Sequence, residues 1–145
     1  MRHWTKVRLC LVLALLMMML ACTRSADVSG NWTGSMSGQN AGKTATSDMD
    51  VALQKTSHGL SGTLTWHNST GAWELMEGNT LDVRSGSVSG NRVAFVAEKS
   101  LPGGTVLINF KGNVDGTTMK GSADLNIGSV MGGDTYLGTL EMTKK

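Results

Sequence analysis

Residues 117–127, Thr-Thr-Met-Lys-Gly-Ser-Ala-Asp-Leu-Asn-Ile, decide the fold class, because small or apolar residues alternate with polar ones along the whole stretch. Met119 and Leu125 fall on one side of this pattern, and Lys120 and Asp124 fall on the other. Successive side chains of an extended chain point to opposite faces, so a period of two predicts a strand with one buried face.

The same alternation recurs along the chain and predicts about eight strands. They are expected near residues 30–37, 47–56, 60–67, 80–87, 92–98, 105–113, 117–127 and 134–143. Turn dipeptides at hairpin spacing separate several of these runs: His58-Gly59, Gly90-Asn91 and Asp115-Gly116. Longer loops are expected at 38–46 and 68–79, and the best helix candidate, residues 72–77, is one and a half turns at most.

A long sheet with one apolar face must close or fold over to hide that face. We therefore expect an all-β fold, an antiparallel up-and-down meander of about eight strands closed into a small barrel over residues 28–145. The opposite face carries Lys, Asp, Glu and many Thr, so it must meet water, and the barrel is predicted to be soluble. Four glycines on the apolar face fit a tightly curved wall: Gly34, Gly62, Gly121 and Gly138.

The N-terminal segment predicts export and a lipid anchor. A basic start precedes an apolar run from Leu9 to Ala21, which is short of the ~20 residues that cross a bilayer as a helix. The run ends Met19-Leu20-Ala21-Cys22, which resembles the lipobox of bacterial lipoproteins. The resemblance implies a signal-peptide helix over 1–21 that is cut before Cys22, acylation of Cys22 (palmitate among the acyl chains) and a short tether over 22–27. Thr23 after the cysteine implies the outer membrane.

Loss of residues 1–21 changes the charge and cysteine counts. Cys10 leaves with the apolar run, so Cys22 is the single mature cysteine and no intramolecular disulfide is possible. Three basic residues leave as well, which leaves ten basic against eleven acidic side chains. The remaining basic residues are scattered along the sequence, so no basic face and no nucleic-acid partner are expected.

The first predicted strand opens with Ser29-Gly30-Asn31-Trp32-Thr33-Gly34. This is similar to the Gly-x-Trp opening of the calycins, the lipocalin and avidin-like barrels. The resemblance implies that Trp32 closes one barrel end, and that a basic residue near the last strand, Lys144 or Lys145, packs on it. The chain lacks the spaced hydrogen-bonding set of avidin itself, so biotin binding is not carried over.

The aromatic residues are few, and most fall on predicted inward positions. Trp32, Trp66, Phe95 and Phe110 either fill the core or line a cavity for a small apolar ligand. A further apolar cluster, made of Trp73, Leu75 and Met76, lies in an expected loop. It either plugs one end of the barrel, which we favour, or lies exposed as a contact for a partner or a membrane.

No catalytic or metal-binding motif is present. A catalytic histidine needs an orienting partner and a nucleophile, and no motif places either near His58 or His67. Asp48 and Asp50 project to the same side of a strand, which is compatible with a cation such as Ca²⁺, although a solvated strand face is the simpler explanation. The sequence predicts no enzyme activity, no cofactor and no metal.

These patterns favour a lipid-anchored protein of the cell envelope, facing the periplasm or the cell surface, whose barrel binds a small apolar ligand. The alternative is a structural or protein-interaction lipoprotein, for example an inhibitor or scaffold, with a filled barrel and no ligand. The expected partners are the membrane, through the anchor, and either a small apolar ligand or an envelope protein.

Overall fold

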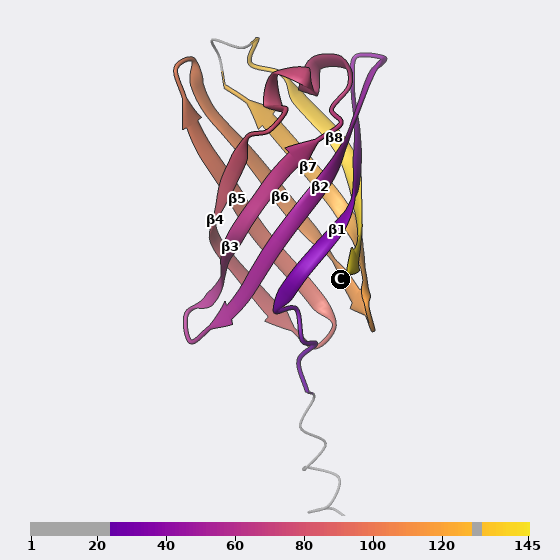
Figure 1. The fold of residues 1–145 in the computed structure, drawn as a ribbon, viewed down its shortest axis with the longest axis vertical. Helices are drawn as coiled ribbons and strands as arrows, with labels where there is room; N and C mark the ends of the chain where they lie inside the picture. Colours follow the sequence, from indigo (N-terminus) through magenta and orange to yellow (C-terminus); the bar gives the residue numbers. More distant parts are fainter. Residues whose placement is uncertain (1–23, 129–131) are drawn as a thin grey trace, which may run out of the picture.

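A computed structural model describes residues 24–128 and 132–145 of the chain, which form one closed β-barrel (Figure 1). The strands are β1 (Gly30–Asn40), β2 (Lys43–Thr56), β3 (Gly59–His67), β4 (Thr80–Ser89), β5 (Arg92–Leu101), β6 (Gly104–Asp115), β7 (Thr118–Ile127) and β8 (Thr135–Lys144). Each strand pairs antiparallel with its sequence neighbour, and β1 pairs with β8 to close the sheet. The predicted fold class is confirmed.

The segments predicted to direct export fall outside this description. Residues 1–21 and Cys22 both lie outside the described residues, so their predicted roles stay predictions. Within the described ranges, no helix has the length and apolar character that crossing a membrane requires. The helical element described there is η1, a 3-10 helix over Gly71–Met76.

One expected loop is replaced by strand. The stretch 38–46 was expected to be a long loop, but β1 runs to Asn40, β2 starts at Lys43, and a two-residue turn joins them. Ala41 and Gly42 both have positive φ, 48° and 78°. Such a turn matches the twist of the flanking strands, which explains how so polar a segment stays paired.

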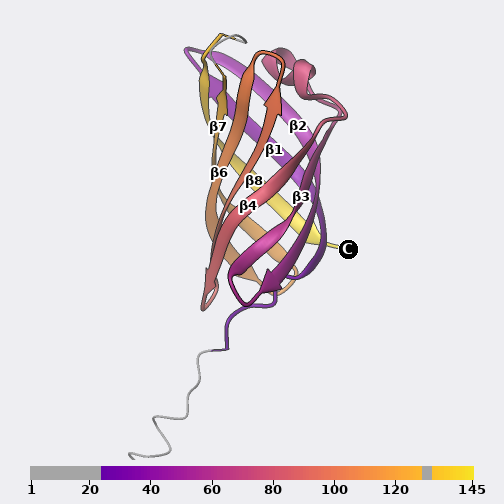
Figure 2. The same cartoon turned by 90° about the vertical axis from the view of Figure 1, so that its left-hand side faces the viewer.

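The barrel has two distinct ends (Figures 1 and 2). The tether end holds the entering N-terminal segment, the turns after β2, β4 and β6, and the C-terminus. The distal end holds the β1–β2 turn, η1, and the connections after β5 and β7. The backbone N–H of Ala26 donates to the carbonyl of Gly90 at 2.7 Å, so the entering chain is fastened to the turn after β4.

The interior follows from the period-two pattern. On β7, Met119 and Leu125 are buried and Lys120 and Asp124 are exposed, as predicted. Large side chains from all eight strands and from η1 form one continuous buried cluster.

Inward glycines let neighbouring strands coil closely. A Cβ added at Gly34, Gly62, Gly121 or Gly138 would collide with the backbone of the adjacent strand. Even alanine would push these strands apart, so the four glycines permit a close approach of neighbouring strands, which a tightly curved wall requires.

Candidate functional site

The tether end of the barrel is closed by Trp32, whose side chain is fully buried. Its indole Nε1 donates to the carbonyl of Val28 at 2.9 Å. The ammonium of Lys144 lies 5.6 Å from the centre of the Trp32 ring and 3.2 Å from a carboxylate oxygen of Asp27. The contact implied by the calycin resemblance is therefore present, and Lys144 rather than Lys145 makes it.

The middle of the interior is occupied by two phenylalanines. Phe95 on β5 and Phe110 on β6 stand opposite each other in the ladder, with ring centres 4.9 Å apart. Gly86 on β4, which also pairs with Phe95, leaves no room for a methyl group beside it. The two rings thus pack against each other at a tilt of 33°, beside a close wall.

The distal end is closed by η1. Trp73 and Met76 are fully buried, and Leu75 is 61% exposed. The Trp73 ring meets Trp66 and Tyr136 edge-on, with ring centres 5.4 Å and 5.8 Å apart. The predicted plug is present, although Leu75 does not belong to it.

The inward glycine Gly38 on β1 makes room for this plug. A Cβ there would lie 2.6 Å from an atom of the Trp73 ring. The ring is therefore seated inside the mouth of the barrel and does not merely cover it.

All four residues predicted to line a cavity, Trp32, Trp66, Phe95 and Phe110, are at most 2% exposed in the barrel interior. Their burial fits a core, and a ligand among them stays a prediction.

Two polar groups in the distal half lack a partner. The indole Nε1 atoms of Trp66 and Trp73 are buried, and no acceptor among the described residues receives their hydrogen bonds.

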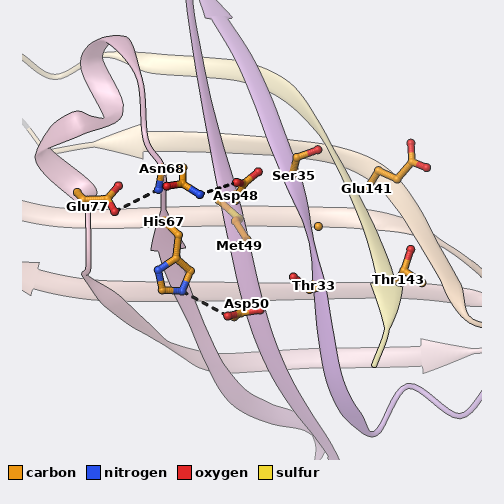
Figure 3. A pocket seen from close by; sticks show the side chains of 11 residues that line it. Thr33, Ser35, Asp48, Met49, Asp50, His67, Asn68, Glu77, Glu141 and Thr143 are labelled. Atoms are coloured by element: carbon orange, nitrogen blue, oxygen red, sulfur yellow. Dashed lines mark hydrogen bonds and ion pairs between the residues drawn. The ribbon is translucent and has the colours of Figure 1, made fainter.

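A polar groove lies on the outer wall of the barrel (Figure 3). This polar groove has a volume of about 750 Å³ and runs across β1, β2, β3 and β8. Met49 contributes an apolar side chain to its lining. The other side chains that line it carry carboxylate, hydroxyl, amide or imidazole groups: Thr33, Ser35, Asp48, Asp50, His67, Asn68, Glu77, Glu141 and Thr143.

The carboxylates of this groove already have partners. Asp50 contacts Lys145 Nζ at 2.7 Å and His67 Nε2 at 3.4 Å. The hydrogen bond from Lys145 is the main reason that the pKa of Asp50 lies below its usual value. Asp48 accepts a hydrogen bond from the side-chain amide of Asn68 at 2.9 Å. These contacts hold the edges of the groove together.

Glu77 fixes the segment that leads into η1. Its carboxylate accepts a hydrogen bond from the backbone N–H of Asn68 at 3.1 Å (Figure 3) and another from the backbone N–H of Ser69 at 2.8 Å. The bond from Ser69 chiefly lowers the pKa of Glu77. Asn68 has a positive φ of 49°, so this carboxylate stabilises an unusual backbone turn.

In the ranges 24–128 and 132–145, no three His, Cys, Asp or Glu residues come together as metal ligands. The sequence did not predict the contact between His67 and Asp50, because they lie diagonally across two strands whose register was unknown. Asp48 and Asp50 do share one outer face, as predicted, and each binds a different neighbour.

Comparison with known proteins assigns no family. No family model matches the chain, and neither a curated protein nor a solved structure matches it.

Proposed function

We propose that this protein is a non-catalytic lipoprotein of the cell envelope, anchored through Cys22, whose barrel is a filled scaffold that acts through its outer surface. This is the alternative that the sequence left open, and the packing of the interior supports it. Trp32 with Lys144 closes one end, Phe95 and Phe110 occupy the middle, and the Trp73 plug closes the other.

The observation that carries the proposal is the direct contact between interior rings. In an open cavity the side chains on non-adjacent walls stand apart. Here the Trp73 ring of η1 packs on Trp66 of β3 and Tyr136 of β8, with ring centres 5.4 Å and 5.8 Å apart. A barrel of eight strands has room either for its own side chains or for one small ligand, and these contacts favour the side chains.

Anchoring is tested by Cys22→Ser, with Cys10→Ser as the matched control. Cys10 lies in the segment that we propose is removed, so its loss leaves the mature protein unchanged. We expect Cys22→Ser to move the protein from the membrane fraction to the soluble fraction and Cys10→Ser to leave it membrane-bound. Retention of Cys22→Ser on membranes after residues 1–21 have been removed would overturn the anchor.

A second candidate, carriage of a small ligand, draws support from the unpartnered indole nitrogens of Trp66 and Trp73. Buried polar groups are nearly always hydrogen-bonded, so a ligand with an acceptor atom in the distal half would satisfy both. A fluorescent fatty acid tests this function. Saturable binding that Trp66→Phe weakens would favour a carrier, since phenylalanine keeps a ring but removes the donor, and absence of binding would favour the filled scaffold.

A further inference from the structure

The fold gathers basic side chains that are scattered in the sequence. Seven of them lie at the tether end, within four residues of a strand end or on the entering chain: Arg24, Lys55, Arg92, Lys111, Lys120, Lys144 and Lys145. Three acidic residues accompany them: Asp27, Asp115 and Glu141. In the rest of the described chain acidic side chains outnumber basic ones, so the barrel is polarised, with its positive end where the chain enters.

A hollow of about 360 Å³ lies at this end, on the outer face of β4, β5 and β6. Its polar lining consists of two cations and three neutral hydrogen-bonding side chains: Arg92, Lys111, Ser87, Ser89 and Asn113. Val93, Ala94 and Gly112 complete the lining, and no acid belongs to it. Arg92 pairs with Asn113 in the ladder and Ala94 pairs with Lys111, so the two cations are diagonal neighbours on one face.

Neither cation is neutralised by a described residue. The ion pairs found in the described ranges involve other basic residues, namely His67, Arg84, Lys120, Lys144 and Lys145. The next acid on the same face of β6 is Asp115, two residues beyond Asn113 and outside the hollow. Arg92 and Lys111 are exposed and available to an anion.

The entering chain places this hollow close to the proposed anchor. Ala26 is hydrogen-bonded to Gly90, which lies in the turn between Ser89 and Arg92. Three residues separate Cys22 from Ala26, so the four steps from one to the other span at most ~14 Å when the chain is fully extended. An acyl group on Cys22 would therefore hold the rim of the hollow within one short tether of the lipid surface.

We propose that the tether end is a membrane-docking surface, and that the Arg92–Lys111 hollow takes the phosphate of an anionic phospholipid headgroup. The inference rests on the proposed anchor, because the anchor brings this end to the membrane. A guanidinium binds phosphate oxygens in pairs, and a lysine adds a point charge. The hydroxyls of Ser87 and Ser89 supply further donors around the phosphate.

The test uses the full chain carrying Cys22→Ser, so that acylation contributes nothing to the binding. Partition is measured by co-sedimentation with vesicles of phosphatidylcholine alone and with one third phosphatidylglycerol. We expect the double substitution Arg92→Gln and Lys111→Gln to reduce partition onto the anionic vesicles roughly tenfold to thirtyfold, the effect of two cations near an anionic surface.

The matched control is Lys43→Gln with Lys99→Gln, which makes the same change in net charge at the distal end. It should change partition less than about twofold. Every variant carries Cys22→Ser and the same residues 1–21, so neither acylation nor that segment contributes to the difference between the two pairs. Equal effects of the two pairs would overturn the docking surface. Binding of inorganic phosphate at low millimolar concentration, together with equal partition of all variants onto the anionic vesicles, would assign the hollow to free phosphate.

Discussion

The ammonium nitrogen of Lys144 lies 5.6 Å from the centre of the Trp32 ring, so the last strand of the barrel reaches over the first. Lys144 and Trp32 are also direct partners in the β1–β8 ladder that closes the sheet. The same ammonium contacts Asp27, and this contact is the main cause of the lowered pKa of that carboxyl group. Lys144 thus belongs to the strand pair that closes the sheet, and its side chain contacts both Trp32, which covers the core, and Asp27 in the entering chain.

Lys144→Met should lower the free energy of unfolding by about 1 kcal/mol, because it removes a cation from the face of a buried tryptophan while keeping the apolar stem. Lys144→Arg should cost less than half of that. Lys145→Met is the control, since Lys145 pairs only with the half-exposed Asp50, and pairs of this kind contribute at most ~0.5–1 kcal/mol. Equal losses for Lys144→Met and Lys145→Met in urea titrations would argue against a special role for the ring contact.

Trp73→Ala should destabilise the barrel by about 3–5 kcal/mol, the usual cost of removing a buried aromatic side chain. Leu75→Ala in the same helix should stay within about 0.5 kcal/mol, because Leu75 is 61% exposed. Chemical denaturation of both variants measures the difference. A small loss for Trp73→Ala would mean that η1 merely covers the distal mouth.

Gly38→Ala and Trp73→Ala should be strongly coupled. Alone, Gly38→Ala forces a methyl group against the Trp73 ring and should cost about 1–3 kcal/mol. In the Trp73→Ala background that clash disappears, so the same substitution should cost clearly less, leaving a coupling energy above about 0.5 kcal/mol in a double-mutant cycle. Additive effects would show that the two residues do not touch in solution.

Gly34→Ala should destabilise the closed sheet by about 1–3 kcal/mol or more, because its Cβ would strike the backbone of β8 at Glu141. Gly116→Asn is a suitable control. Its site has a positive φ of 57°, which asparagine tolerates, and no atom lies within 4 Å of an added Cβ. Thermal unfolding should separate the two variants, and similar melting temperatures would contradict the close approach of β1 and β8.

As the pH falls, the segment before η1 should lose its structure before the barrel unfolds. The lowered pKa of Glu77 means that its contribution is fully present above its unfolded value of about 4.5 and is lost as pH falls through the lower folded value. Hydrogen-exchange protection of the Asn68 and Ser69 amides should therefore decline in that acidic range. Glu77→Gln should abolish this pH dependence and Glu74→Gln should preserve it, whereas a decline that persists in Glu77→Gln would assign it to another group.

The barrel could be predicted because its signal is local. Alternation in runs such as 117–127 depends only on neighbouring residues, and turns such as Asp115-Gly116 follow known backbone preferences. The β1–β2 turn was missed because Ala41 is a poor residue for positive φ and gives no turn signal. The pairing of β1 with β2 on both sides of the turn imposes the positive φ on Ala41.

The outer-surface features could not be predicted, because they depend on register across strands. Arg92 and Lys111 are far apart in sequence and become neighbours only through the β5–β6 ladder. The contact of His67 with Asp50 similarly depends on how β3 pairs with β2. Trp73 lies in the connection between two strands and packs against Gly38 on β1, and no sequence pattern links these two residues.

The central claim is that side chains alone fill this barrel. Native mass spectrometry of the protein extracted from its own membranes tests it most directly. The account predicts the mass of residues 22–145 plus acyl chains on Cys22, with nothing further released on unfolding. A small molecule that stays with the folded protein and leaves only when the barrel opens would contradict it.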